Sequence, residues 1–200
     1  RIVIGDPTDG GTGMGPVTSE SQLQELREGI DALAAAGTIA TGGSEPVGDQ
    51  GWFLRPTLVV ANDADDALFH EKELFGPVAV ILPYDASKGP EEAARLANKG
   101  GGSLLGAIYC DDGEWAKACA LGMAPWHGRV WVDSARAKGQ AMPPGMVLPS
   151  MIHGGPGRAG GGQELGGLRG LEDYLQRTAI QGFGGWVKAE FGAPEPVEAS

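Results

Sequence analysis

The chain has 200 residues, 42% of them hydrophobic and 20% charged, which is enough apolar chain for a core and excludes a disordered acidic tail. Its 15 basic and 26 acidic residues give a net charge of −11, and a nucleic acid would be repelled by such a surface. Glycine contributes 35 residues, against about 7% in average proteins, but the absence of a G-X-Y period excludes collagen and many tight turns are expected instead.

Residues 18–36 have the pattern of an amphipathic helix. Ser19 and Gln22 match a capping box, and Gly37 stands where a left-handed C-terminal cap is expected. The apolar positions that fall on one face are Leu23, Leu26, Ile30 and Leu33. A short strand over residues 38–41 is predicted to follow.

Strands and helices alternate along the next hundred residues. Four further strands are predicted at residues 56–61, 78–82, 104–109 and 129–132. Helices are predicted between them, a short one at residues 67–69 and longer ones at residues 90–99 and 113–121. This alternation predicts an α/β fold in which at least some strands are parallel.

The last third of the chain differs in composition. Residues 136–170 are rich in glycine and proline, and so long a loop is uncommon unless it works at a site. Residues 171–176 suggest one or two helical turns. Residues 177–181 alternate like a strand that has no obvious partner in this chain, and residues 182–200 are interpreted as a tail.

The two cysteines and three histidines give little support for a metal or disulfide framework. His70, His127 and His153 have no partner at metal-ligand spacing, so we expect no metal site. Cys110 precedes two aspartates, which oppose a thiolate, and Cys119 suits a small core residue. We expect a protein of a reducing, cytoplasmic compartment, with no membrane span and no secretory leader.

Residues 155–160 spell Gly-x-Gly-x-x-Gly, the formal pattern of a dinucleotide-binding turn. The pattern follows no convincing strand and contains Pro156, so a Gly-rich connection is the better interpretation. No P-loop and no Gly-x-Ser-x-Gly elbow occurs in the sequence.

The segment 71–78 places a carboxylate and an aromatic ring two residues apart before a Gly-Pro turn. If the backbone there is extended, Glu73 and Phe75 point to one face, where they suit sugar hydroxyls and a flat ring. The alternative is a solvated glutamate beside a core phenylalanine, and the residues alone favour that alternative.

Residues 1–181 resemble the C-terminal part of the NAD(P)-dependent aldehyde dehydrogenase superfamily. The resemblance is carried by segments that occur in the family's order, namely Gly5-Asp6-Pro7, Met14-Gly15-Pro16, Gly42-Gly43, Arg55-Pro56-Thr57, Glu73-Leu74-Phe75-Gly76-Pro77, Ala97-Asn98 and Gly162-Gln163-Glu164-Leu165-Gly166. The Gly-rich run from His153 to Arg169 is similar to the bacterial aromatic-catabolism branch. That branch holds the bifunctional ring-cleavage enzyme of phenylacetyl-CoA degradation and the dehydroadipyl-CoA semialdehyde dehydrogenase.

The resemblance implies a three-layer α/β catalytic-domain portion, over residues 1–170, that uses NAD or NADP. In the family a cysteine thiolate attacks the aldehyde and a thioester is then hydrolysed. Glu73 matches the residue that binds the nicotinamide ribose, and Phe75 the one beside the nicotinamide ring. Ile152 and His153 match positions near the aldehyde pocket, where the family commonly has Pro-Phe. Glu164 matches a glutamate implied in water or proton handling.

The resemblance places the nucleophilic cysteine before Arg1, so we expect this chain alone to be inactive and its N-terminus to be cut from something longer. The expected substrate is a small aldehyde, with a CoA-linked semialdehyde as the candidate. The expected partners are a second copy, through an oligomerisation segment at 171–181, and a fused hydratase domain. The alternative function is a non-catalytic dehydrogenase lobe kept for assembly.

Overall fold

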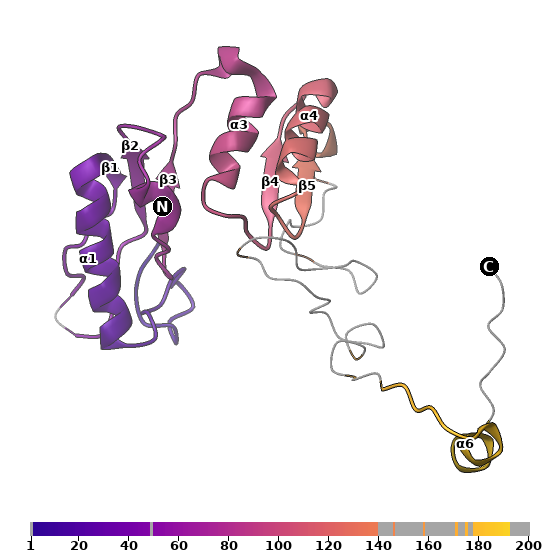
Figure 1. The fold of residues 1–200 in the computed structure, drawn as a ribbon. Helices are drawn as coiled ribbons and strands as arrows, with labels where there is room; N and C mark the ends of the chain where they lie inside the picture. Colours follow the sequence, from indigo (N-terminus) through magenta and orange to yellow (C-terminus); the bar gives the residue numbers. More distant parts are fainter. Residues whose placement is uncertain are drawn as a thin grey trace.

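The computed structural model describes residues 2–48, 50–139, 146, 158, 171, 175 and 178–192 (Figure 1). The strands in this part are β1 (Gly37–Thr41), β2 (Thr57–Ala61), β3 (Val78–Ile81), β4 (Gly106–Tyr109) and β5 (Val130–Asp133). The helices are α1 (Glu20–Ala36), α2 (Leu68–Glu71), α3 (Gly89–Asn98), α4 (Gly113–Met123) and α6 (Gly184–Phe191), with 3-10 turns η1 (Ala86–Lys88) and η2 (Ala135–Ala137).

The described strands form two sheets. In the first, β1 pairs antiparallel with β2, and β2 pairs parallel with β3. In the second, β4 and β5 are parallel. The predicted α/β class and its partly parallel strands are therefore confirmed, and the five strands predicted between residues 38 and 132 lie within one or two residues of those observed.

Helix α1 begins and packs as its sequence predicts. The hydroxyl of Ser19 accepts a hydrogen bond from the backbone N–H of Gln22 at 3.2 Å. The predicted reciprocal bond is shifted by one residue, since Gln22 Oε1 accepts from the N–H of Thr18 at 2.9 Å. The apolar face of α1 packs with Leu54 in a buried cluster beneath the first sheet, through Leu23, Leu26 and Ile30.

The expectation for Gly37 was wrong. Its backbone is extended, with φ −146° and ψ −172°, rather than left-handed, because β1 starts directly where α1 ends. A Cβ built on Gly37 would lie 2.7 Å from the carbonyl oxygen of Val60 and 2.8 Å from Cγ1 of Val59. Glycine is needed at this position for the close approach of β1 to β2.

The second half of the described chain has its own core. Helix α4 packs on β4 and β5, and α3 packs along α4. The buried members of this cluster are Ala94, Ile108, Ala116, Cys119 and Met123. Asp112 caps α4, since its Oδ1 accepts from the N–H groups of Glu114 at 3.0 Å and Trp115 at 3.1 Å.

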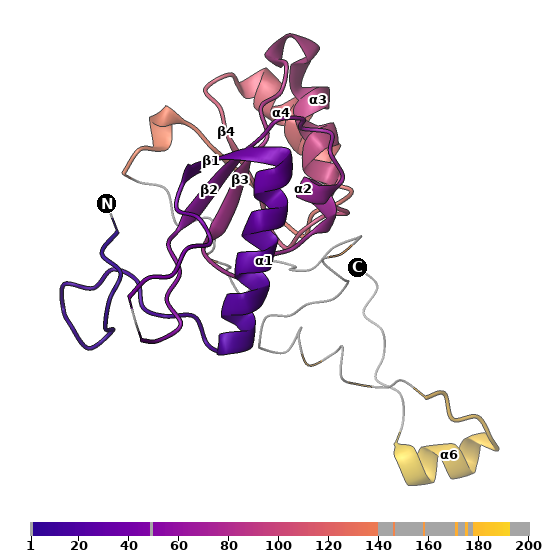
Figure 2. The ribbon, with the colours of Figure 1, turned by 90° about the vertical axis from the view of Figure 1, so that its left-hand side faces the viewer.

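The first sheet has one face covered by α1 and one that no described helix covers. Figure 2 looks onto α1 with the sheet behind it. The alternation of β2 and its register with β3 place Leu58 and Val60 beside Ala79 and Ile81 on the far face. A hollow of about 410 Å³ with mostly apolar lining, including Met14, Leu58 and Ala79, lies there. Parallel sheets are normally covered on both faces.

Part of the stretch 182–200, which the sequence indicates as a tail, is helical. Gly184–Phe191 form α6, which Figures 1 and 2 show set apart from both sheets. Its aromatic side chains are exposed, Phe183 by 83%, and the rings of Trp186 and Phe191 meet edge to face. Thr178 to Gln181, the described part of the predicted terminal strand, pair with no other strand of the described chain. None of the described helices is both long enough and apolar enough to cross a membrane.

An ion cluster joins the loop after β2 to α3. Asp65 receives two hydrogen bonds from the guanidinium of Arg95, at 2.7 and 2.9 Å, and one from Lys99 at 2.7 Å. Arg95 also binds Glu92 at 2.8 Å. The hydrogen bonds from Arg95, followed by those from Lys99, hold the pKa of the Asp65 carboxyl well below its usual range. This cluster therefore ties the loop between β2 and α2 to α3 and the residue that follows it.

We expect the stability of the chain to fall with acid through Asp65. Its pKa is lower in the folded than in the unfolded state, so its contribution is complete above about pH 4 and is lost as the pH falls below that value. Thermal unfolding followed from pH 6 to pH 3 should show a smaller loss of Tm for Asp65→Asn than for the unchanged chain. Glu45→Gln, at an exposed carboxylate before β2, is the control. Parallel curves for Asp65→Asn and the unchanged chain would contradict this role.

Candidate functional site

The segment between α2 and β3 presents the two residues singled out from the sequence. Leu74 turns inward and packs against the apolar cluster of α1. Its neighbours turn the other way, and Glu73 and Phe75 have 71% and 83% of their side chains exposed, respectively. The alternation expected of an extended backbone is present, and Phe75 is not a core residue.

Two glycines let this segment lie directly on α1. A Cβ on Gly29, within the helix, would come 2.8 Å from Cδ1 of Leu74. A Cβ on Gly76 would lie 2.5 Å from Cδ1 and 2.6 Å from Cδ2 of Leu26. Neither position has room for a larger side chain, so the segment and the helix are in contact on both sides of Phe75.

Gln22 holds the backbone of the segment at Phe75. The side-chain amide Nε2 donates to the backbone carbonyl of Phe75 at 2.6 Å, while Oε1 accepts from Thr18 at 2.9 Å. The residues joined are 53 positions apart. The sequence pattern assigned Gln22 to helix capping only, and no local signal predicts this second role.

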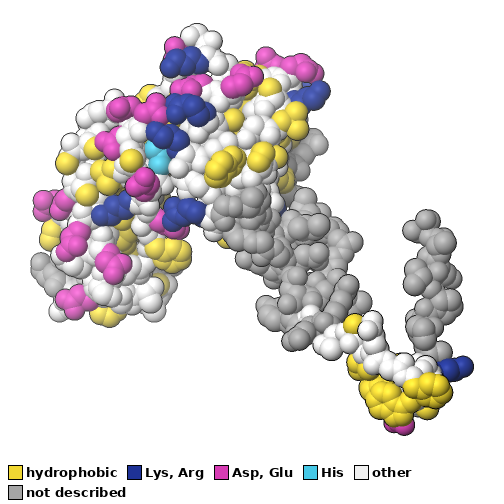
Figure 3. All heavy atoms as spheres, in the orientation of Figure 1, with side chains coloured by type: hydrophobic (Ala, Val, Ile, Leu, Met, Phe, Trp, Pro, Cys, Tyr) yellow, Lys and Arg dark blue, Asp and Glu magenta, His cyan; other side chains and the backbone are white. Residues whose placement is uncertain are grey.

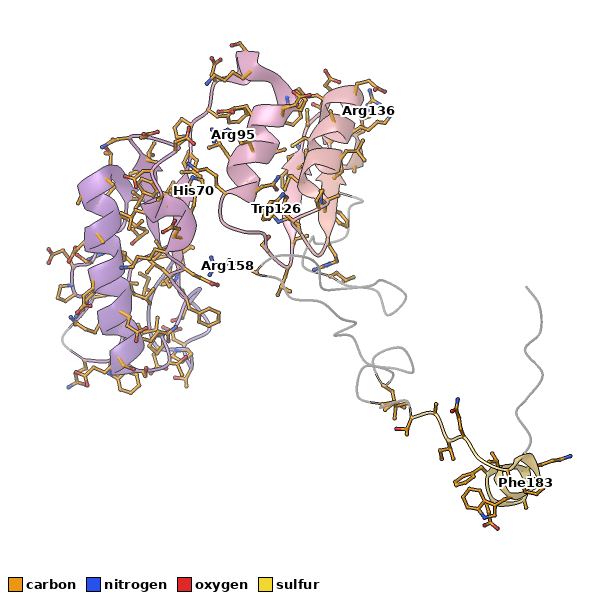
Figure 4. The ribbon with its side chains drawn as sticks, in the orientation of Figure 1. His70, Arg95, Trp126, Arg136, Arg158 and Phe183 are labelled. Atoms are coloured by element: carbon orange, nitrogen blue, oxygen red, sulfur yellow. The ribbon has the colours of Figure 1, made fainter. Side chains whose placement is uncertain are left out.

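Arg158 makes the second long-range contact that sequence reasoning missed. Its Nη2 donates to Oε2 of Glu73 at 3.2 Å, and its backbone N–H donates to the carbonyl of Gly101 at 2.8 Å. Figure 4 shows Arg158 between the half of the molecule that carries α1 and the half that carries α3 and α4. Arg158 is the one residue of the Gly-x-Gly-x-x-Gly pattern at 155–160 that the structure describes.

A hollow of about 230 Å³ lies between α1 and the segment. It is lined by Gln22, Glu25, Leu26, Glu28, Lys72, Glu73, Leu74 and Phe75. Acidic side chains are scattered over this half of the surface in Figure 3. Carboxylate oxygens accept hydrogen bonds and an exposed ring offers a flat apolar face, so the hollow suits a polyhydroxy group attached to an aromatic ring.

The other predicted site residues are not part of this arrangement. Ile152, His153 and Glu164 lie outside the described residues. His70 bonds through Nε2 to the carbonyl of Ala64 at 2.7 Å, at the end of α2 (Figure 4). Among the described residues no group of three or more histidine, cysteine or acidic side chains could hold a metal ion.

His127 serves the second core. Its Nδ1 lies 2.8 Å from Oγ of Ser103 and its Nε2 lies 3.2 Å from Oδ1 of Asn98. Burial lowers the pKa of this imidazole, which favours the neutral ring. With the proton on Nε2, the ring donates to Oδ1 of Asn98, while Nδ1 contacts the hydroxyl of Ser103, which donates to the carbonyl of Leu105 at 2.9 Å. His127 thus ties the end of α3 to the loop before β4.

The cysteines differ in exposure. Cys119 is buried in the second core with its thiol 3.8 Å from the sulfur of Met123, and burial raises the pKa of the thiol. Such a group resists forming the thiolate that a nucleophile requires. Cys110 is partly exposed at the end of β4, beside a hollow of about 330 Å³ that Lys117 and Arg136 also line.

We expect Gly29→Ala to displace Leu74 and so disturb the segment that carries Glu73 and Phe75. Overpacking outweighs the better helix propensity of alanine, for a net loss of about 1 to 2 kcal/mol in the free energy of unfolding. Urea denaturation measures this loss. Gly113→Ala is the matched control, since it lies in α4 and a Cβ there meets no atom within 4 Å. Equal free energies of unfolding for the two variants would show that the contact between Leu74 and α1 can accommodate an added methyl group.

Comparison with known proteins adds relatives over most of the chain. Residues 1–180 match the model of the aldehyde dehydrogenase family. "Protein MaoC" of Klebsiella aerogenes is 41% identical over 171 residues, which cover 84% of this chain and 50% of that protein. The 3,4-dehydroadipyl-CoA semialdehyde dehydrogenase of Aromatoleum evansii is 32% identical over 160 residues, which cover 76% of this chain and 30% of that enzyme.

Solved structures give the same result. A betaine aldehyde dehydrogenase of Staphylococcus aureus, crystallised with NAD+, superposes with a TM-score of 0.71 at 31% identity over 88% of this chain. An aldehyde dehydrogenase of Pseudomonas syringae, crystallised with NAD+ and octanal, superposes with a TM-score of 0.70 at 29% identity over the same share. Each match covers 33% of the solved chain, so this chain spans half or less of the length of the proteins it resembles.

Proposed function

The chain belongs to the aldehyde dehydrogenase family, and on that premise we propose that it is the C-terminal part of an enzyme that oxidises an aldehyde to the acid with NAD or NADP. The observation that carries the proposal is the joint exposure of Glu73 and Phe75 beside one hollow. These are the residues that the family resemblance assigns to the nicotinamide ribose and the nicotinamide ring.

The residues present fit one end of a dinucleotide. The carboxylate of Glu73 can accept hydrogen bonds from two ribose hydroxyls, and the ring of Phe75 offers a face beside which a nicotinamide can lie. The hollow, at about 230 Å³, is smaller than the 300 to 1,000 Å³ typical of pockets for whole small ligands. The adenosine end would therefore be held elsewhere. When bound, the cofactor supplies the hydride acceptor.

The nucleophile is proposed to lie outside these 200 residues. Burial makes Cys119 unsuited to form a thiolate. In the reaction we propose, a thiolate adds to the aldehyde carbon, a hydride leaves that carbon for the cofactor, and water hydrolyses the thioester to the acid and restores the thiol. The contribution of this chain is to bind and orient the cofactor, with Glu164 proposed to handle the water or its proton and Ile152 and His153 to line the aldehyde pocket.

The uncovered face of the first sheet supports a missing portion of the domain. Leu58, Val60, Ala79 and Ile81 form an apolar surface beside a parallel strand pair, and burial on both faces is the rule for such pairs. We propose that the remaining part of the catalytic domain supplies the third layer there. Residues 171–181 are proposed to pair with a second copy, and a hydratase domain is the proposed fusion partner.

For the substrate we propose a semialdehyde, with one linked to CoA as the specific candidate. The relatives' names support this class, since one acts on a dehydroadipyl-CoA semialdehyde and another, from Deinococcus radiodurans, on succinate semialdehyde. The sequence supports the aromatic-catabolism branch through Ile152 and His153, which stand where the family commonly has Pro-Phe. An imidazole in place of an aromatic wall suits a more polar aldehyde.

We predict that the purified 200-residue chain forms no NAD(P)H from an aldehyde, because the nucleophile is proposed to lie outside it. The measurement is nicotinamide absorbance with a panel of semialdehydes, and the control is the complete protein carrying the upstream cysteine. Turnover by the isolated chain would contradict the assignment of the nucleophile. An inactive complete protein would instead favour the non-catalytic assembly role, in which residues 177–181 pair with the sheet edge of another chain.

In the complete enzyme, Glu73→Gln should raise the KM for the nicotinamide cofactor by roughly 10- to 100-fold, because a hydrogen bond to a charged group is lost. Labelling of the nucleophilic thiol should be unchanged. Glu71→Gln is the matched control, an exposed glutamate two residues away. Unaltered cofactor binding in Glu73→Gln would remove the ribose assignment.

A further inference from the structure

The backbone and side chain of Arg158 contact the loop at Gly100 and Gly101. Its backbone N–H donates to the carbonyl of Gly101 at 2.8 Å, and its Nη1 lies 3.4 Å from the carbonyl of Gly100. A Cβ on Gly101 would lie 3.2 Å from both Cγ and Cδ of Arg158, so the side chain lies across this glycine. Gly101 also has φ +80°, a conformation that favours glycine. The aliphatic part of the Arg158 side chain therefore packs against the loop at Gly101.

The guanidinium and the carboxylate meet across the two halves of the molecule. Nη2 of Arg158 donates to Oε2 of Glu73 at 3.2 Å, over a separation of 85 residues. Among the described residues no other hydrogen bond reaches this carboxylate. The contact therefore holds one oxygen of the carboxylate, Oε2.

The hollow beside the contact between Arg158 and Glu73 is lined by other charged side chains. Glu25 and Glu28 line the same hollow as Glu73, and like charges repel one another. Lys72 also lines it, but its ammonium is a flexible point charge, whereas a guanidinium is a planar donor with fixed directions. The ion pair between Arg158 and Glu73 is exposed, so it contributes little to the free energy of folding. Its effect is to set the direction in which the carboxylate of Glu73 points.

We infer that Arg158 is a positioning residue that orients the carboxylate of Glu73 toward the cofactor hollow. The inference rests on the proposed function, since it concerns the same site. The Gly-x-Gly-x-x-Gly spacing of residues 155–160 does not indicate this role of Arg158. Arg158 is not placed in contact with the cofactor, and its effect passes through Glu73.

A double-mutant cycle in the complete enzyme tests the inference. Arg158→Gln should raise the KM for NAD+ or NADP+ by about 3- to 10-fold and leave kcat within about twofold, since orientation affects binding of the cofactor. Arg158→Lys should recover part of the loss. In a Glu73→Gln background, Arg158→Gln should have no further effect, because its partner is gone. Arg136→Gln, at an exposed arginine that lies far from Arg158 in Figure 4, is the matched control.

An NMR measurement on the 200-residue chain separates this inference from the proposed function. The guanidinium resonances of Arg158 should shift in Glu73→Gln and stay in place in Glu71→Gln, whether or not the protein oxidises aldehydes. Unshifted resonances would overturn the inference, as would multiplying effects of the two substitutions on KM or an unchanged KM in Arg158→Gln. An inactive complete enzyme with shifted resonances would defeat the proposed function while leaving the contact established.

Discussion

The packing of Leu74 against α1 is the contact on which the candidate site depends. It is one leucine between two exposed residues, and its inward position forces Glu73 and Phe75 outward together. Gly29 and Gly76 allow this close approach, since a Cβ at either position would meet a leucine side chain. A short, irregular connection between α2 and β3 thereby gains the fixed geometry that a binding site needs, although it has no regular secondary structure of its own.

Much of the fold could be predicted because its signals are local. The apolar spacing of α1 and the continuous apolar run of β2 each indicate the burial of residues a few positions apart. Gly37 shows the limit of such reasoning. Glycine occurs both where φ is positive and where another backbone comes near, and only the pairing of β1 with β2 decides between these causes. Helix α6 was missed because Gly184 and Gly185 at its start suggest a loop.

The site could be predicted only in part, for a related reason. The same-face placement of Glu73 and Phe75 follows from their spacing, but the residues that hold them come from elsewhere in the chain. Gln22 acts over 53 residues and Arg158 over 85, and both act on groups that no pattern marks, a backbone carbonyl and one carboxylate oxygen. Partners of this kind are set by how α1 and the loop near Gly101 come together, which is a property of the tertiary structure.

A cofactor site that is formed by two portions of a protein requires each portion to have the right geometry. If the cofactor's other end and the nucleophile are held by a portion that packs on the apolar face of the first sheet, the hollow beside Phe75 must have its shape before that portion arrives. The contacts that shape it are internal to this chain: Leu74 on α1, Gln22 on the carbonyl of Phe75 and Arg158 on Glu73. Preorganisation of this sort lowers the cost of ordering side chains when the ligand binds. The binding geometry of the lobe therefore depends on packing within α1 and its neighbouring segment more than on the covering layer.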